Sequence, residues 1–282
     1  MPIKHIAVLG AGTMGHGIAS AAITGGFATR MFDVSAAALA KGEAAIDRVL
    51  AKGIDLGKLA PDDADAMRKR LTTTANIGEA LEGADFVIEA APEKIDLKLS
   101  LMADIETHAP ASAVVATNTS ALSITEMAGV LKNPSRAAGM HFFNPVHRMK
   151  LVEIVRALET SPGTLQAIED VARQMGKDTV VVRESPGFIT TRVNASIGNE
   201  AFYMLMEGVA SARDIDKALK LGLNHPMGPF ELGDLVGLDT RLSILEYLHK
   251  SMGEKYRPCP LLVQYVKAGR LGRKVGKGVY EY

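Results

Sequence analysis

The chain has 282 residues, of which 47% are hydrophobic, so it can bury a large core and form two domains or one large domain. Its formal net charge of +0 argues against a nucleic-acid partner, which requires a basic face. The one cysteine, Cys259, excludes an internal disulfide and a cysteine metal cluster, so we expect no metal and a reducing, cytoplasmic compartment. No apolar run is long enough to span a bilayer, and we expect no membrane partner.

Residues 3–9 form a short, mostly apolar run, which predicts a buried strand. A glycine-rich loop and a helix-like stretch over residues 17–24 follow at once. Strand, tight turn and helix form the setting in which a G-x-G-x-x-G loop binds a dinucleotide. Its glycines permit the turn, the approach of backbone amides to a pyrophosphate, and close packing of the helix. The loop residues that we expect to contact the cofactor are Gly10, Gly12, Thr13, Met14 and Gly15.

A second strand over residues 28–32 ends in Asp33, about twenty residues beyond the glycines. An acidic side chain at this place binds the hydroxyls of the adenosine ribose. A carboxylate also repels a 2′-phosphate, and no arginine follows Asp33, so the sequence predicts NAD rather than NADP as cofactor. The complete order of strand, loop, helix, strand and acid favours this interpretation over a plain glycine turn with a helix-capping aspartate.

Two helical patterns, over residues 36–52 and 61–70, are long for a connection between parallel strands and predict a protruding helical hairpin. The remaining elements expected in this part of the chain are strands at 85–90, 114–117, 138–142, 151–155 and 179–183, and a helix at 164–175. This α/β alternation predicts a doubly wound, Rossmann-like domain over residues 1–184.

The pattern changes at the Ser-Pro-Gly phrase of residues 185–187. The segments that follow read as helices at 188–207, 212–220, 230–236, 239–251 and 260–268. They predict an all-α C-terminal domain over residues 185–282.

The phrase HFFNP begins with His141 at the carboxyl end of a predicted strand, where open α/β sheets bind their ligands. Glu153 lies on the next predicted strand, so the two side chains can meet. Oxidising a secondary alcohol requires a base for the hydroxyl proton, and a neutral imidazole oriented by a carboxylate can serve as that base. The pair therefore predicts hydride chemistry on an alcohol, with a structural histidine in a turn as the alternative.

Several phrases run in order along the chain: GAGTMGHGIA (10–19), DFVIEAAPE (85–93), ATNTSALSIT (116–125), GMHFFNPV (139–146), MKLVEIV (149–155), SPGF (185–188), DIDKALKLGLNHPMGPFELGDLVGLD (214–239) and LGRKVGKGVYEY (271–282). In these phrases the chain resembles the short-chain L-3-hydroxyacyl-CoA dehydrogenases, in particular the 3-hydroxybutyryl-CoA dehydrogenases. The resemblance implies NAD as cofactor, an acyl-CoA substrate and catalysis by His141 and Glu153. It also implies a homodimer formed through the C-terminal domain, where apolar phrases such as Leu219–Leu223 predict an interface.

The resemblance assigns further roles at the ends of the predicted strands. Ser120 would reach the substrate 3-oxygen, with a plain turn or capping serine as the alternative. Asn118 and Asn144 would contact nicotinamide or its ribose. Glu93 and Lys98 match cofactor contacts of the family, although a surface ion pair is an alternative for Lys98. The family receives the CoA nucleotide at the helical hairpin. Lys52 is the best candidate there for phosphate contact, and a solvated helix face is an equal alternative.

The chain departs from the family pattern at two places. Thr191 stands where an asparagine usually helps to bind the substrate, and Asn194 follows one helical turn later on the same face, where it could take over. His147 and Arg148 stand where many members have small apolar residues. Both changes bear on substrate contacts more than on the reaction.

The leading hypothesis is NAD-dependent oxidation of (S)-3-hydroxyacyl-CoA, 3-hydroxybutyryl-CoA in particular, to 3-oxoacyl-CoA, and the reverse. One alternative is a related dehydrogenase of a free hydroxy acid, of the gulonate dehydrogenase and lambda-crystallin type. Another is a cofactor-binding protein without turnover, which the presence of His141, Glu153 and Ser120 disfavours.

Overall fold

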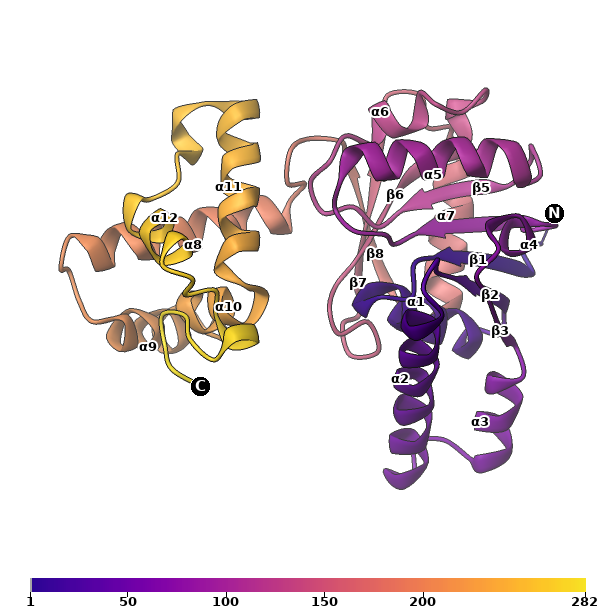
Figure 1. Ribbon diagram of the computed structural model, residues 1–282, viewed down its shortest axis with the longest axis horizontal. Coiled ribbons are helices and arrows are strands. Elements are labelled where there is room, and N and C mark those ends of the chain that lie inside the picture. Colours follow the sequence, from indigo (N-terminus) through magenta and orange to yellow (C-terminus); the bar gives the residue numbers. More distant parts are fainter. Residues whose placement is uncertain (1) are drawn as a thin grey trace. The chain divides into compact units, whose positions relative to one another are not determined.

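An eight-stranded sheet organises the first part of the computed structural model, which describes residues 2–282 (Figure 1). The strands are β1 (His5–Leu9), β2 (Ala28–Phe32), β3 (Leu71–Thr74), β4 (Phe86–Glu89), β5 (Val114–Thr117), β6 (Ala137–Phe142), β7 (Leu151–Arg156) and β8 (Asp178–Arg183). Their order is β3-β2-β1-β4-β5-β6-β7-β8, and every pair is parallel except β6 with β7. The expected doubly wound sheet is confirmed. The sequence analysis did not predict the strand β3 or the antiparallel pairing of β6 with β7.

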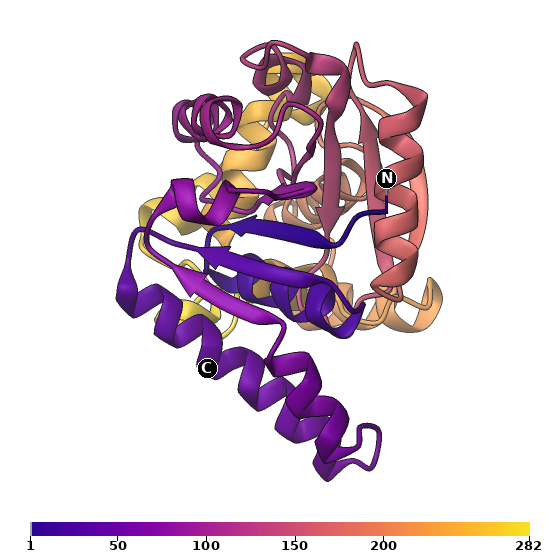
Figure 2. The same cartoon turned by 90° about the vertical axis from the view of Figure 1, so that its right-hand side faces the viewer.

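Helices follow the strands along this part of the chain. They are α1 (Thr13–Thr24), α2 (Ala36–Asp55), α3 (Pro61–Arg68), α4 (Ile77–Leu81), α5 (Ile95–His108), α6 (Ile124–Ala128), the 3-10 turn η1 (Pro134–Arg136) and α7 (Pro162–Gln174). Figures 1 and 2 show α2 and α3 side by side beyond the edge of the sheet, which confirms the helical hairpin. Arg68 of α3 joins the pair by reaching Asp47 of α2 at 2.9 Å and Glu43 at 3.5 Å.

The middle of the sheet is buried on both faces, as parallel strands between two helical layers require. All four residues of β4 are buried, and so are residues 6–9 of β1. The buried residues of these two strands are apolar with one exception, Glu89 at the carboxyl end of β4, which is fully buried. A carboxylate in that position requires strong hydrogen-bond partners.

The chain divides into two compact units between Glu184 and Ser185, and the second unit is helical. Its elements are α8 (Thr190–Met206), α9 (Ala212–Gly222), α10 (Pro229–Val236), α11 (Leu238–Met252), η2 (Glu254–Tyr256), α12 (Pro260–Lys267) and η3 (Arg273–Val275). Phe202 packs edge-on against Phe230, with ring centroids 5.1 Å apart. Buried Asp234 anchors the last residues of the chain by accepting hydrogen bonds from the Val279 and Tyr280 amides. Within residues 2–282, none of the helices has the combination of length and apolar character needed to cross a membrane.

Candidate active site

The glycine loop between β1 and α1 has the close contacts that a tight strand-to-helix turn requires. Gly10 has φ +112°, a conformation that favours glycine, and a Cβ there would lie 2.8 Å from the Ala90 carbonyl oxygen. A Cβ on Gly15 would lie 1.8 Å from the Gly10 carbonyl oxygen, so only glycine allows the helix this near the strand. A Cβ on Gly12, by contrast, would have no neighbour within 4 Å. The backbone at the start of α1 is therefore open to an anionic ligand.

A cavity of about 380 Å³ opens beside this loop. It is lined by Leu9, Gly10, Gly12, Thr13, Met14, Phe32, Asp33, Val34, Ala90, Ala91, Pro92, Leu97 and Leu101. Asp33 is positioned by the Ala11 amide, which donates to Oδ2 at 2.9 Å, and by the Ser35 amide, which donates to Oδ1 at 3.0 Å. Apolar walls with one fixed carboxylate suit an adenosine, and no lysine or arginine is among the described residues of the lining to receive a 2′-phosphate. The residues present therefore fit NAD.

His141 and Glu153 face each other across the antiparallel strands β6 and β7. The two residues are register partners, which explains how a spacing of twelve brings them together. The His141 Nδ1 lies 2.7 Å from the Glu153 Oε2, and both side chains are buried. A carboxylate only accepts, so Nδ1 carries the proton and the basic atom of the neutral ring is Nε2. The expected contact is present, and its geometry is that of an imidazole oriented by a carboxylate.

Ser120 lies in the turn after β5, and Glu93 holds this turn in place. One Glu93 oxygen, Oε1, accepts hydrogen bonds from the Ser120 amide at 2.8 Å and from the Thr119 hydroxyl at 2.6 Å. Asn118 Oδ1 accepts a hydrogen bond at 2.8 Å from the amide of Phe142, the residue after His141. These bonds bring the carboxyl ends of β4, β5 and β6 together around the serine and histidine segments.

Lys98 is buried, so the alternative that it forms a surface ion pair is wrong. It is 1% exposed, and its ammonium lies 2.8 Å from both carboxylate oxygens of Glu89 and 3.5 Å from Glu93. The Ala91 amide and the Thr117 hydroxyl each donate to Glu89 at 2.6 Å. Glu89 thus joins the ends of β4 and β5 to α5 and helps to shape the wall at Ala91. Sequence reasoning missed this residue, although a carboxylate closing an apolar strand was a visible signal.

Lys52 lines a second cavity, of about 780 Å³, between the helical hairpin and the segment that follows β6. Its lining consists of Thr13, His16, Gly17, Ser20, Ala45, Arg48, Val49, Lys52, Gly53, Leu56, Lys58, Asn144, Pro145, Val146, His147 and Arg148. Among these described residues there is no aspartate or glutamate. Lys52 therefore belongs to a cluster of basic side chains around a cavity, and Asn144 shares this cavity rather than the one beside Asp33.

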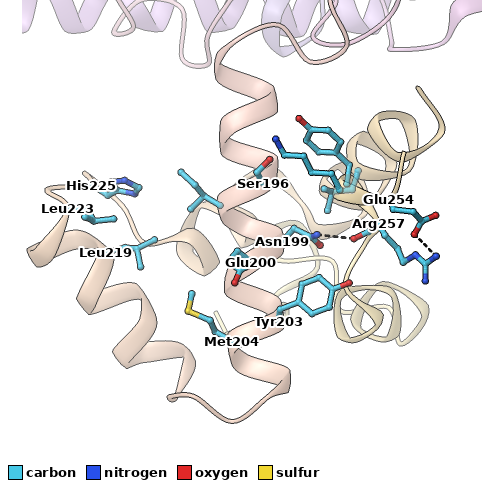
Figure 3. Close-up of a pocket in the computed structure, with 14 residues that line it drawn as sticks. Ser196, Asn199, Glu200, Tyr203, Met204, Leu219, Leu223, His225, Glu254 and Arg257 are labelled. Atoms are coloured by element: carbon cyan, nitrogen blue, oxygen red, sulfur yellow. Dashed lines mark hydrogen bonds and ion pairs between the residues drawn. The ribbon is translucent and has the colours of Figure 1, made fainter. Parts of the chain in front are cut away.

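Thr191 and Asn194 lie in the first turns of α8 and are both half-buried. The C-terminal unit holds a cavity of about 540 Å³. Figure 3 shows side chains from α8, α9 and the segment around Glu254 that line it. Buried Asn199 connects α8 to the segment around Arg257, because its amide nitrogen donates a hydrogen bond to the Arg257 carbonyl at 2.9 Å. Neither Thr191 nor Asn194 is in the described lining of this cavity.

Comparison with known proteins identifies relatives along the whole chain. Residues 5–185 match the family described as 3-hydroxyacyl-CoA dehydrogenase, NAD binding domain, and residues 187–282 match 3-hydroxyacyl-CoA dehydrogenase, C-terminal domain. A Bacillus subtilis protein named "Probable 3-hydroxybutyryl-CoA dehydrogenase" is 46% identical over 283 residues, with 100% of this chain and 98% of that protein covered. The 3-hydroxybutyryl-CoA dehydrogenase of Bradyrhizobium diazoefficiens is 42% identical over 281 residues, covering 99% and 96%. The crystal structure of (S)-3-hydroxybutyryl-CoA dehydrogenase from Ralstonia eutropha matches with a TM-score of 0.96 and 43% identity, covering 100% of this chain and 99% of that one.

Proposed function

The chain belongs to the 3-hydroxyacyl-CoA dehydrogenase family, and from this premise we propose how its residues divide the work of the reaction. The protein is an NAD-dependent enzyme that oxidises (S)-3-hydroxyacyl-CoA to 3-oxoacyl-CoA and catalyses the reverse. The names of its relatives favour 3-hydroxybutyryl-CoA as substrate over a free hydroxy acid. The observation that carries the mechanism is the buried contact of 2.7 Å between His141 and Glu153.

His141 is the general base in the direction of oxidation. Its Nε2 accepts the proton of the substrate 3-hydroxyl, and Glu153 stabilises the imidazolium that results. The Ser120 hydroxyl hydrogen-bonds the same substrate oxygen, since the Glu93 contacts fix its turn beside the strand ends. The chemistry that NAD supplies when bound is the acceptance of a hydride from C3. In the reverse direction the His141 imidazolium returns the proton to the oxygen.

The cofactor is held by the loop and the strand ends around it. Amides of Gly12, Thr13 and Met14 at the start of α1 bind the pyrophosphate, with the helix dipole favouring its charge. Asp33 binds the adenosine ribose. The nicotinamide and its ribose are contacted by Asn118, Asn144 and Glu93. Lys98 positions Glu93 through an ion pair of 3.5 Å.

The CoA nucleotide binds in the basic cavity of the helical hairpin. Lys52 contacts a phosphate there, and the lack of carboxylates among the described lining residues supports an anionic occupant. On the C-terminal unit, Thr191 or Asn194 supplies the polar contact to the substrate that an asparagine makes in most of the family.

We also propose a two-fold symmetric homodimer in a cytoplasmic compartment. Apolar side chains remain exposed on the C-terminal unit, including Leu221 at 76% and Leu223 at 67%, and surface of this kind marks interfaces. Light scattering of the dilute native protein should give twice the chain mass of 30.0 kDa. A scattering mass equal to one chain would contradict the dimer. Buried, unpaired Cys259 fits a reducing compartment.

The change in NADH absorbance tests the reaction itself. Acetoacetyl-CoA should be reduced with NADH, whereas free acetoacetate with NADH and gulonate with NAD should give no comparable rate. Turnover of a free hydroxy acid without turnover of the CoA ester would establish the gulonate dehydrogenase type instead. Binding of NADH without turnover of any of these compounds would establish a cofactor-binding protein.

A further inference from the structure

The basic cavity contains His16, His147 and Arg148, of which His147 and Arg148 stand where many members of the family have small apolar residues. His16 comes from the first turns of α1, and His147 and Arg148 come from the segment after β6. They face Arg48 and Lys52 of the helical hairpin across the same cavity. Two imidazole rings and several cationic side chains therefore line one space.

The segment that bears His147 and Arg148 is held in place by Lys177 and by α1. The Lys177 ammonium donates hydrogen bonds to the carbonyls of Val146 and Met149, the latter at 3.0 Å. Gly17 of α1 also lies against Val146, because a Cβ on Gly17 would be only 2.9 Å from Val146 Cγ2. The part of the cavity wall that bears His147 and Arg148 is therefore preformed in the absence of a ligand.

The His16 ring is also oriented. Its Nδ1 lies 2.8 Å from the Gly12 carbonyl oxygen, which only accepts, so Nδ1 carries a proton. The second ring nitrogen, Nε2, is therefore the one left to face a ligand.

We propose that His147, with His16 and Arg148, binds the phosphates of the acyl-CoA substrate, and that this binding is coupled to proton uptake by His147. Substrate affinity then rises as the pH falls. The proposal rests on the proposed function, since it assigns the phosphates of that substrate to this cavity.

Electrostatics gives the direction of the coupling. The pKa of His147 lies below its ordinary value, first because of burial and then because of the positive charges of Arg148, Lys177, Lys52 and His16. His147 is therefore mostly neutral near pH 7 in the free enzyme. A bound polyphosphate offsets those positive charges and favours the imidazolium, so its pKa rises and a proton is taken up. Affinity changes between the lower pKa of the free state and the higher pKa of the bound state, by at most about tenfold per pH unit for one proton.

Calorimetric titration of the full-length protein with CoA tests the coupling. The heat of binding, measured at pH 7 in buffers of different ionisation enthalpy, reports the number of protons taken up. The wild type should take up a substantial fraction of one proton and bind CoA more tightly at pH 6.5 than at pH 7.5. The variant His147→Gln should take up fewer protons and bind CoA more weakly at pH 6.5. His108→Gln, at an exposed histidine at the end of α5, is the matched control and should behave as the wild type.

Comparison between variants removes the contribution of the CoA phosphate itself, which also titrates near pH 6. Binding of NADH by His147→Gln shows that the variant is folded. Equal proton uptake by the wild type and His147→Gln would overturn the proposal, and so would the absence of uptake in the wild type. The N-acetylcysteamine thioester of acetoacetate, which lacks the nucleotide, distinguishes a failure of the cavity assignment from a failure of the proposed function. Turnover of this thioester without proton-linked CoA binding refutes the cavity assignment alone, whereas no turnover with thioester or CoA ester refutes the proposed function.

Discussion

Replacing Glu153 by glutamine tests the catalytic pair most directly, because the change keeps the shape of the side chain and removes its charge. The Glu153 carboxylate is fully buried, and its Oε2 lies 2.7 Å from the His141 Nδ1. The glutamine carbonyl oxygen can still accept a hydrogen bond from the His141 Nδ1–H, so the ring stays near its place. What the variant loses is the negative charge that stabilises the imidazolium in the transition state.

The size of the loss follows from this geometry. A hydrogen bond to a charged group contributes about 1.5–3 kcal/mol, whereas two unit charges about 4 Å apart contribute about 4 kcal/mol at an effective dielectric constant of about 20. Each 1.4 kcal/mol corresponds to about a tenfold change in rate. We therefore expect kcat of Glu153→Gln to fall by about 10- to 1,000-fold.

The assay is reduction of acetoacetyl-CoA, followed by NADH absorbance, together with direct measurement of NADH binding. The dissociation constant of NADH should stay unchanged, because Glu153 is assigned no cofactor contact. His141→Ala should lose still more of the rate while binding NADH as well as the wild type. The matched control is Glu159→Gln, an exposed carboxylate beyond the end of β7, which should keep the wild-type kcat. A kcat for Glu153→Gln within threefold of the wild type would refute the assigned role.

Three further predictions concern the cofactor, the substrate contact and the buried ion pair. Asp33→Ala should lower kcat/KM with NAD by about tenfold or more, because a hydrogen bond to a charged group is lost, and should reduce the preference for NAD over NADP. An unchanged ratio of kcat/KM with NAD to kcat/KM with NADP would contradict the ribose contact. Asn194→Ala should lower kcat/KM for acetoacetyl-CoA by about three- to tenfold, more than Thr191→Ala does, and the opposite ranking would assign the contact to the threonine hydroxyl. Glu89→Gln should lower the free energy of unfolding, measured in urea, by about 3 kcal/mol, because it leaves the Lys98 ammonium buried with only part of its ion pairing; a loss below about 1 kcal/mol would show that Glu93 alone compensates.

Most of the sheet was predictable because its central strands are continuous apolar runs that end at glycine or polar residues. The strand β3 was missed, since its four residues include three threonines and its core contact comes from Leu71 alone. The short helix α4 was missed for a related reason, because a helix of five residues is held mainly by the Asn76 cap and by packing. The His141 and Glu153 contact was predictable from neighbouring strands, although only the pairing register shows that the strands are antiparallel and the residues opposite.

The Glu89 and Lys98 pair shows where local patterns stop being informative. The two residues lie nine positions apart, one at the end of a strand and the other in the first turn of a helix, so neither helical nor strand periodicity relates them. Charged residues at the start of a helix normally face solvent, which made a surface ion pair a reasonable expectation for Lys98. Only the path of the loop through Ala91 turns α5 so that the ammonium points at the buried carboxylate.

The basic cavity shows the same limit for electrostatics. A net charge of +0 describes the whole chain, whereas a phosphate group responds mainly to charges within a Debye length of about 8–10 Å. His16 lies more than a hundred positions before His147 and Arg148, so no window of the sequence reveals that they share a lining with Arg48 and Lys52. The neutral balance excludes an extended basic face of the kind that nucleic acids need, but it leaves room for a local anion site. Folding creates the basic cavity by separating these cations from the acidic residues that balance them elsewhere in the chain.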